Sequence, residues 1–360
     1  MYSNELNAIK KSNIFRQKVL YDESLLDLAS NDYLGLSSKF ALLTRAVSRL
    51  KMFKSHAPKA SQLVNGYHQI HKDFEEFLCR HNGFEDAILA GSGFLANLAL
   101  IEALPRKGDI LILDEKYHAS GILAGKLVSA KVVTFEHNNP EKLEEILKNS
   151  TYKKAIIAVE GIYSMSGNLL KKEIFEVVEK YKNTLLIVDE AHSSGVVGEN
   201  FLGVFELFNI KPQLNHIKMG TLGKAYGSYG AYILSSKHII EFLQNRAKSL
   251  IYTTAPSLID IELAHQGMLF IMKNKKTLHA KIKKRQELVK MCFGIDMLGL
   301  IFTYEMNSST EVLNMQNELK KRGFLVGAIR PPTVEKPMLR VIPRVNVPLK
   351  DLKRLFYVYM

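Results

Sequence analysis

The chain contains 360 residues, of which 47% are hydrophobic and 24% charged, the balance of an ordinary globular protein. No apolar run reaches the roughly 18 to 20 residues that span a bilayer, and the opening residues lack the apolar stretch of a secretory signal, so we predict no membrane association. The formal net charge of +13 could mark a basic scaffold or a nucleic-acid-binding module. The basic residues are scattered, however, apart from a run at residues 281–285 with amphipathic helical spacing, and we predict no nucleic-acid partner. Cys79 and Cys292 lack metal-ligand spacing and are predicted to be buried thiols in a reducing compartment, the cytoplasm.

The predicted elements begin with a leader that carries one helical segment. Between residues 84 and 235, short β-rich runs alternate with amphipathic helical stretches. The runs at residues 155–159 and 185–188 are continuously apolar, as in strands buried on both faces. Repeated alternation of this kind predicts an α/β fold with a mostly parallel sheet and helices on both faces.

Beyond residue 256 the pattern changes to two long helical stretches followed by short β-like segments. This change predicts a smaller α+β domain at the C-terminal end. We therefore predict an N-terminal segment at residues 1–38, a large domain at 39–262 and a small domain at 263–360.

The segment from Ile88 to Asn97 reads as a strand, a glycine turn and the start of a helix. Free backbone N–H groups at such a helix start bind phosphate. Residues 91–96 also fit the pattern G-x-G-x-x-A, and Asp114 follows the next strand, so an NAD-dependent oxidoreductase is one alternative. A dehydrogenase would leave two segments further along the chain unexplained.

The first of these segments, residues 185–195, is an apolar strand that runs into Asp189, with His192 three residues later. In an open α/β sheet, ligands bind at the carboxyl ends of the strands. Asp189 is therefore placed where a site would form, although an Asp at this position could also cap the next helix.

The second segment, residues 216–230, sets Lys224 among several glycines. Glycines allow a ligand to approach the backbone closely, and a partly desolvated lysine can lose its proton and act as an amine nucleophile. Pyridoxal 5′-phosphate (PLP) needs such a lysine for its aldehyde and an anion beside its ring nitrogen. Lys224 and Asp189 could supply both.

Taken together, these segments resemble the α-oxoamine synthases, a family of fold-type I PLP-dependent transferases, from about residue 25 to residue 345. Three further segments carry the same resemblance: SNDYLGLS at residues 30–37, DEKYHAS at 114–120 and EGIYSMSG at 160–167. The resemblance implies a large α/β/α domain, a smaller C-terminal domain and PLP as cofactor.

Four activities compete within this family. AIRPPTV at residues 328–334 resembles most closely the members that condense L-alanine with a pimeloyl thioester, carried by coenzyme A or a carrier protein, to make 8-amino-7-oxononanoate for biotin. The alternatives are the 2-amino-3-ketobutyrate ligase, 5-aminolevulinate synthase and serine palmitoyltransferase activities. A positive net charge would suit coenzyme A or an acidic carrier protein.

The resemblance also implies roles around the cofactor ring. Lys224 would hold the cofactor covalently and later carry the α-proton, and Asp189 would pair with the ring nitrogen. His192 would bind the phenolic oxygen, with Ser164 beside it, and His118 would stack on the ring. Glu160 is expected to contact these side chains without contacting the cofactor ring itself.

For the cofactor phosphate, the resemblance implies backbone N–H groups of Gly93 and Phe94 and the hydroxyl of Thr221. Thr253 and Thr254 would reach the phosphate of a neighbouring subunit, which predicts a homodimer with its active site at the interface.

The substrates are assigned to His118 and to four other residues. Arg16 and Thr333 match positions that contact the acyl substrate, Asn31 belongs to the substrate-binding set, and Arg340 would bind the carboxylate of the amino acid through its guanidinium fork. The chain departs from the family in two places: Gln62 stands where an Arg is expected, and the stretch 334–340 is about two residues short.

Overall fold

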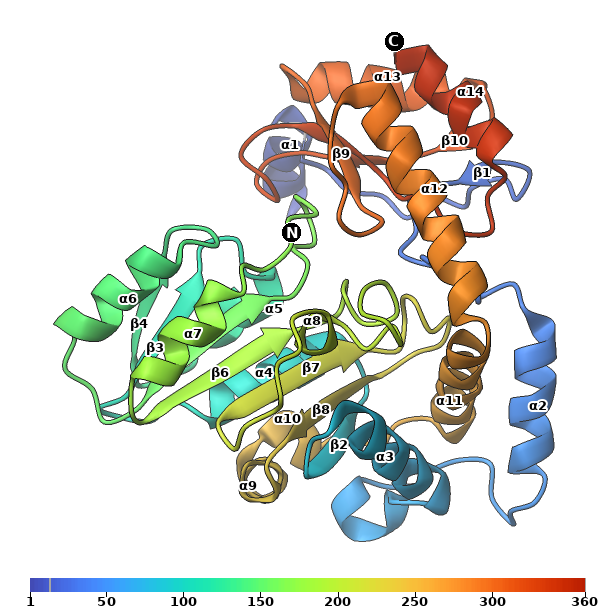
Figure 1. The fold of residues 1–360 in the computed structure, drawn as a ribbon. Coiled ribbons are helices and arrows are strands. Elements are labelled where there is room, and N and C mark those ends of the chain that lie inside the picture. The colour runs from blue at the N-terminus through green and yellow to red at the C-terminus, as the bar shows by residue number, and fades with distance from the viewer. Residues whose placement is uncertain (13, 360) are drawn as a thin grey trace. The chain divides into compact units, whose positions relative to one another are not determined.

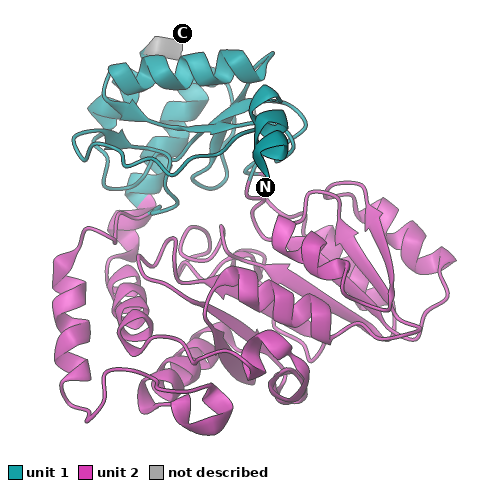
Figure 2. Cartoon of the chain, turned by 180° about the vertical axis from the view of Figure 1, so that it is seen from behind, with its two compact units in different colours: residues 1–33, 165–167, 280–360 teal, residues 34–164, 168–279 magenta. Residues whose placement is uncertain are grey.

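The computed structural model describes residues 1–12 and 14–359 and divides them into two compact units. The larger unit comprises residues 34–164 and 168–279, and the smaller one residues 1–33, 165–167 and 280–360 (Figure 2). Residue 360, although grouped with the smaller unit, lies outside the described residues.

A seven-stranded sheet forms the centre of the larger unit, in the order β2-β8-β7-β6-β5-β3-β4 (Figure 1). Only β8 runs antiparallel to its neighbours, so the sheet is mostly parallel, as predicted. The strands are β2 (Asp86–Ala90), β3 (Ile110–Asp114), β4 (Lys131–Phe135), β5 (Ala155–Glu160), β6 (Thr184–Asp189), β7 (His216–Thr221) and β8 (Ala231–Ser235).

Helices connect and cover these strands. They are α2 (Phe40–Leu50), the π-helical turn η1 (Gln62–Gly66), α3 (Gln69–Asn82), α4 (Gly93–Ala103), α5 (Ala119–Gly125), α6 (Pro140–Asn149), α7 (Glu173–Lys180), α8 (Val204–Leu207), α9 (Lys237–Arg246), α10 (Lys248–Ile251) and α11 (Leu258–Lys273). Strands and helices alternate in the part of the chain where this was predicted, in agreement with the predicted fold-type I architecture.

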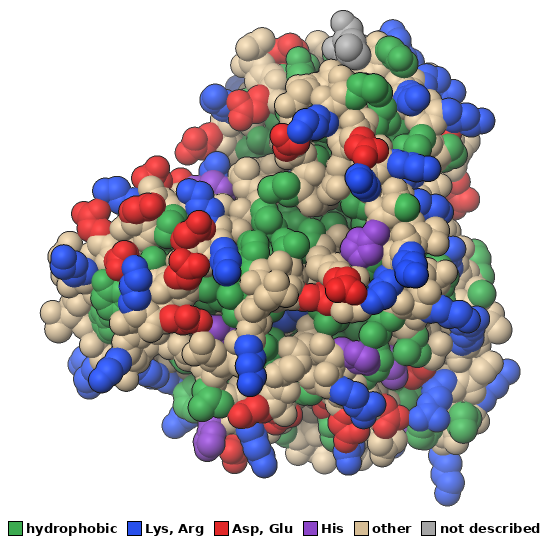
Figure 3. All heavy atoms as spheres, in the orientation of Figure 1, with side chains coloured by type: hydrophobic (Ala, Val, Ile, Leu, Met, Phe, Trp, Pro, Cys, Tyr) green, Lys and Arg blue, Asp and Glu red, His purple; other side chains and the backbone are tan. Residues whose placement is uncertain are grey.

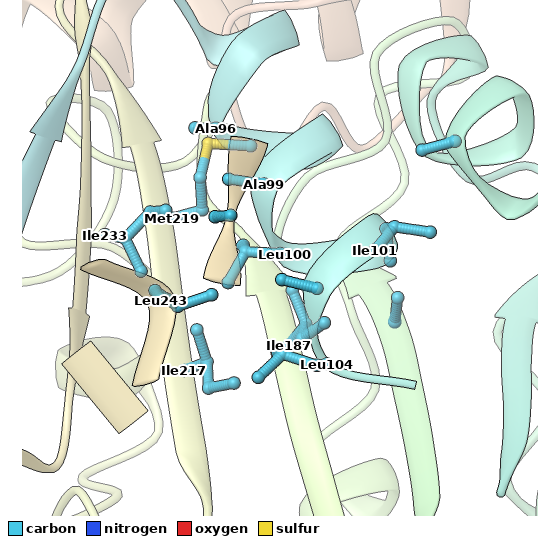
Figure 4. Packing of buried hydrophobic residues seen from close by; sticks show 14 of the residues in the cluster. Ala96, Ala99, Leu100, Ile101, Leu104, Ile187, Ile217, Met219, Ile233 and Leu243 are labelled. Carbon is cyan, nitrogen blue, oxygen red and sulfur yellow. The ribbon is translucent and has the colours of Figure 1, made fainter. Parts of the chain in front are cut away.

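The main hydrophobic core lies between α4 and the middle strands. Ala96, Ala99 and Leu100 of α4 are fully buried and belong to one cluster with Ile187 of β6 and Ile217 of β7 (Figure 4). Small residues on α4 let the helix axis approach the sheet closely. Burial of this apolar surface fixes α4, and with it the glycine turn at its start, against the strands that carry Asp189 and Lys224.

The smaller unit contains an antiparallel sheet in the order β11-β12-β9 and a parallel pair of β1 with β10. Its strands are β1 (Leu26–Asp27), β9 (Phe302–Glu305), β10 (Phe324–Leu325), β11 (Gly327–Ile329) and β12 (Met338–Val341). Its helices are α1 (Ser3–Lys11), α13 (Ser309–Lys321) and α14 (Leu349–Tyr359), while α12 (Lys275–Phe293) begins in the larger unit and continues in the smaller one.

These units differ from the three segments predicted from sequence. The first 33 residues group with the C-terminal part, and β1 pairs with β10 there. Residues 263–279 group with the larger unit, where α11 packs against α2 and α3. Both differences arise from contacts between segments far apart in the chain, which local pattern does not report.

Surface features agree with the composition. Lys and Arg side chains are interspersed with Asp and Glu on the face shown in Figure 3. Among the described residues, no helix is both long and apolar enough to cross a membrane. Cys79 and Cys292 are free thiols, and both are partly exposed rather than buried as predicted.

Candidate active site

Asp189 ends strand β6 and is 4% exposed. Its Oδ2 accepts a hydrogen bond of 2.8 Å from Asn97 Nδ2, and its Oδ1 accepts one of 2.9 Å from the Ala191 N–H. Asn97 Oδ1 in turn accepts a bond of 2.6 Å from the Tyr117 hydroxyl. Each Asp189 oxygen keeps a second lone pair, so the carboxylate can still accept a donor from a bound ring.

Lys224 lies in the turn that follows β7, and its Nζ is 2.8 Å from His192 Nε2. His192 is 5% exposed and follows Asp189 by three residues. Gly227, in the same turn, has a φ of 64°, and a Cβ there would lie 2.8 Å from the Leu36 backbone. A side chain at residue 227 would therefore displace the turn that presents the amine.

His118 and Glu160 lie within the electrostatic range of both residues. Burial lowers the pKa of His118, the charge of Asp189 raises it and that of Lys224 lowers it. Glu160 ends β5 directly opposite Asp189 in the strand register, and its Oε2 accepts a bond of 2.9 Å from the Ser164 N–H. Burial, and then the neighbouring Asp189 charge, raise the pKa of Glu160 well above its usual value. Burial and the Asp189 charge thus both favour the neutral form of Glu160.

The start of α4 lies close to the end of β7. Ser92 caps this helix through Leu95 N–H at 3.3 Å, and Gly93 and Phe94 are its first residues. A Cβ on Gly93 would lie 3.6 Å from Thr221 Cβ, so the helix start faces the end of β7. Backbone N–H groups at a helix start can bind phosphate, so Gly93 and Phe94 remain the residues predicted to hold it, while the Thr221 hydroxyl donates to the Gly230 carbonyl at 3.1 Å in this structure.

The donor set fits PLP. A lysine amine, a buried carboxylate, an imidazole and a helix start come from the ends of β6, β7 and β2, which is what the aldehyde, ring nitrogen, phenolic oxygen and phosphate of PLP require. Glu160 Oε1 is buried and has no hydrogen-bond partner among the described residues, which is consistent with room for a polar group beside it.

The other predicted residues lie elsewhere. Thr253 is half-buried and Thr254 exposed in the turn after α10. In the smaller unit, Arg16 Nη2 donates to Thr333 Oγ1 at 3.3 Å, and the two residues predicted to contact the acyl substrate thus lie side by side. Also in that unit, Asn31 accepts a bond of 3.4 Å from Tyr33, and Arg340 lies on β12, 5% exposed.

Asn97 and Tyr117 were not among the site residues predicted from the sequence. Both are buried, and together they connect α4 and the end of β3 to Asp189. A signal was present for Asn97, because it is the one amide side chain in α4, whose only other strongly polar residue is Glu102 near its end. Gln62, at the position where the resemblance implies an Arg, donates from Nε2 to the Leu89 carbonyl at 2.8 Å. Its amide thus helps to hold strand β2.

Residues 23–356 match the family described as aminotransferase class I and II, and the chain belongs to this family. The chain is a PLP-dependent enzyme that transfers an acyl group, and the NAD-dependent alternative is wrong.

Three known proteins show how close the similarity is. The chain is 46% identical to an 8-amino-7-oxononanoate synthase of Helicobacter pylori, over 99% of this chain and 95% of that protein. A solved 8-amino-7-oxononanoate synthase from Francisella tularensis is 26% identical, with a TM-score of 0.73 over 94% of this chain and all of that one. A serine palmitoyltransferase from S. paucimobilis shares the fold, with a TM-score of 0.87 and 22% identity over 99% of this chain and 95% of that one.

Proposed function

We propose that the protein condenses L-alanine with a pimeloyl thioester, with loss of carbon dioxide, to give 8-amino-7-oxononanoate for biotin biosynthesis. The observation that carries this proposal is the 46% identity to the Helicobacter pylori synthase over almost the whole of both chains. The AIRPPTV segment supports it from the sequence. The acyl carrier is coenzyme A or a carrier protein, either of which suits a net charge of +13.

When bound, PLP supplies an electron sink for the negative charge that develops on the α-carbon as the α-proton leaves. Lys224 is the group that binds the cofactor and then takes and returns this proton at Nζ. His192, 2.8 Å from that nitrogen, orients it. Asp189 is held in place by Asn97 and Ala191, which donate to its two oxygens, and is assigned to the ring nitrogen.

The remaining assignments concern the substrates. His118 orients the reacting centre, and Arg340 binds the carboxylate of alanine through its two-pronged guanidinium. Arg16 and Thr333 contact the acyl chain, and Asn31 belongs to the same set. The α-carbon forms a bond with the thioester carbonyl carbon while the thiol leaves. The carboxylate then departs as carbon dioxide, and a proton returns to the α-carbon.

We assign Thr253 and Thr254 to the cofactor phosphate of the neighbouring copy in a homodimer. Tyr252, beside them, is 82% exposed in the single chain, which leaves this turn accessible to a partner. The two free cysteines support a reducing compartment, in line with the expected cytoplasmic location.

A substrate panel tests this function. Alanine, glycine and serine are each combined with pimeloyl-CoA, acetyl-CoA, succinyl-CoA and palmitoyl-CoA, and release of the thiol and of carbon dioxide is measured. We expect kcat/KM for alanine with pimeloyl-CoA to exceed every other pair by at least about tenfold, the effect of about 1.4 kcal/mol of selective binding. Lys224→Ala is the control, and it should lose both turnover and the visible absorption band of the lysine-bound cofactor. A clear preference for glycine or serine would overturn the proposal.

A further inference from the structure

Within the larger unit, a buried ion pair is formed by two residues that neighbour the candidate site along strands β6 and β7. Glu190 follows Asp189 at the end of β6, and Lys218 lies on β7, the strand that leads to Lys224. Their side chains are 0% and 1% exposed, and Lys218 Nζ is 3.6 Å from Glu190 Oε1. Removing two charges from water is costly unless both are well partnered, so their surroundings decide what the pair does.

The carboxylate of Glu190 holds the start of α8. Its Oε2 accepts from the Ser193 hydroxyl, and both its oxygens accept from the Val204 N–H, at 3.0 and 2.8 Å. Gly203, just before α8, has a φ of 95°, and a Cβ there would lie 2.0 Å from Glu190 Oε2. The backbone at residue 203 therefore comes as close to the carboxylate as only glycine permits.

The ammonium group of Lys218 completes the cluster. It donates to Asn82 Oδ1 at 2.8 Å and to the carbonyl oxygen of Leu202. Lys218 thus binds the loop before α8 through the Leu202 carbonyl, and Glu190 binds the first residue of α8 through the Val204 N–H. Burial lowers the pKa of Lys218, while the charge of Glu190 acts in the opposite direction and favours the protonated amine.

The pair is coupled to the catalytic groups through the backbone. Because successive side chains of a strand point to opposite faces, Asp189 faces Asn97 of α4 while Glu190 faces α8. The Glu190 N–H donates to Met219 O at 2.6 Å, and the Glu190 carbonyl accepts from the Ser194 N–H at 2.9 Å. These bonds join the end of β6 to β7 and form the turn that carries His192.

We propose that Lys218 and Glu190 form a positioning pair that sets Asp189 and His192 relative to Lys224 without touching cofactor or substrate. The inference rests on the PLP site but not on the choice of alanine and a pimeloyl thioester. The quantity to measure is therefore the visible absorption band of the lysine-bound cofactor, which does not depend on the amino acid that the enzyme prefers.

The test uses the PLP-loaded enzyme with Glu190→Gln, Lys218→Met and both changes together. We expect each variant to move the pH midpoint of the visible cofactor band by at least about half a unit, because the distances from Lys224 to its charged neighbours change. We also expect kcat to fall about tenfold with KM for the amino acid changed less than about threefold, since orientation rather than binding is lost. Lys180→Met, which breaks the exposed pair with Glu144, is the control and should leave the midpoint unchanged.

The double variant separates positioning from mere stability. It removes both charges at once, so its unfolding temperature should lie closer to the parent than that of either single variant, while its band midpoint stays displaced. A folded double variant with the parent's midpoint and kcat would overturn the proposal. If the double variant does not fold, Glu190→Asp decides, because it keeps the charge but draws the carboxylate back from Val204. A parental midpoint in Glu190→Asp would equally refute the pair's role.

Discussion

Two acids end β5 and β6 opposite each other, and their surroundings differ. Asp189 accepts hydrogen bonds from Asn97 and Ala191. Glu160 is fully buried, and burial together with the neighbouring Asp189 charge raises its pKa well above the usual value. This difference divides their roles: Asp189 is the acid assigned to the ring nitrogen, and Glu160 lies beside it.

Asp189→Asn tests this division at the scale of one residue. The replacement has the same shape but no charge, so we expect the fold to persist while kcat falls at least about a hundredfold, equivalent to about 2.7 kcal/mol of lost stabilisation. Steady-state kinetics of the PLP-loaded variant, with thermal unfolding alongside, provide the measurement. Asp296→Asn, at an exposed ion pair with Lys290, is the matched control. Near-full activity in Asp189→Asn would remove this residue from its role.

At the scale of elements, a buried carboxyl ties helix α3 to strand β2, which leads into the glycine turn of the site. Glu75 of α3 accepts from the Leu89 N–H at 3.2 Å and from the Tyr67 hydroxyl at 2.6 Å. Burial, the largest effect, raises the pKa of Glu75 from 4.5 to about 8. The neutral carboxyl is thus part of what holds β2 against α3.

This raised pKa predicts how stability depends on pH. Between pH 4.5 and about 8 the folded protein keeps a proton on Glu75 that the unfolded chain has released, so the free energy of unfolding falls as pH rises. The contribution is at most about 1.4 kcal/mol per pH unit. In Glu75→Gln the side chain is neutral at every pH, so urea unfolding between pH 5 and 8 should show a shallower decline than in the parent. Glu76→Gln, at an exposed neighbour, should keep the parental slope, and equal slopes in Glu75→Gln and the parent would contradict the prediction.

At the scale of the whole molecule, the proposed homodimer makes each site depend on two chains. Lys224 and Asp189 come from one copy, and Thr253 and Thr254 are assigned to the other. A single chain would then lack part of its phosphate site, and two differently damaged subunits could restore one complete site when paired.

Hybrid dimers test this dependence. Lys224→Ala and the double change Thr253→Val with Thr254→Val should each be nearly inactive as homodimers. When equal amounts are dissociated and reassociated, about half of the dimers are hybrids with one intact site, so activity should return to roughly a quarter of the parent's, by simple statistics of closed two-fold pairing. Mixing without dissociation is the control. If threonines of the same chain served the site, no activity would return.

Much of the fold was predictable from local pattern. Alternating apolar runs and helical stretches between residues 84 and 235 predict the α/β sheet, because parallel strands need helical connections that leave a period in the sequence. The antiparallel direction of β8 was not predicted. Strand direction depends on which neighbours pair, and an apolar run such as residues 231–235 reads the same in either orientation.

The amino-acid sequence by itself predicted the chemistry of the site: Lys224 among glycines, Asp189 at the end of a buried strand and a helix start at Gly93 suited to phosphate. Each depends on a few consecutive residues, so each leaves a local signature. Only the tertiary structure decided that Asn97 and Tyr117 hold Asp189, that Lys218 pairs with Glu190, and that the first 33 residues join the smaller unit. These relations join side chains or strands far apart in the chain, and they exist only once the sheet has brought their elements together.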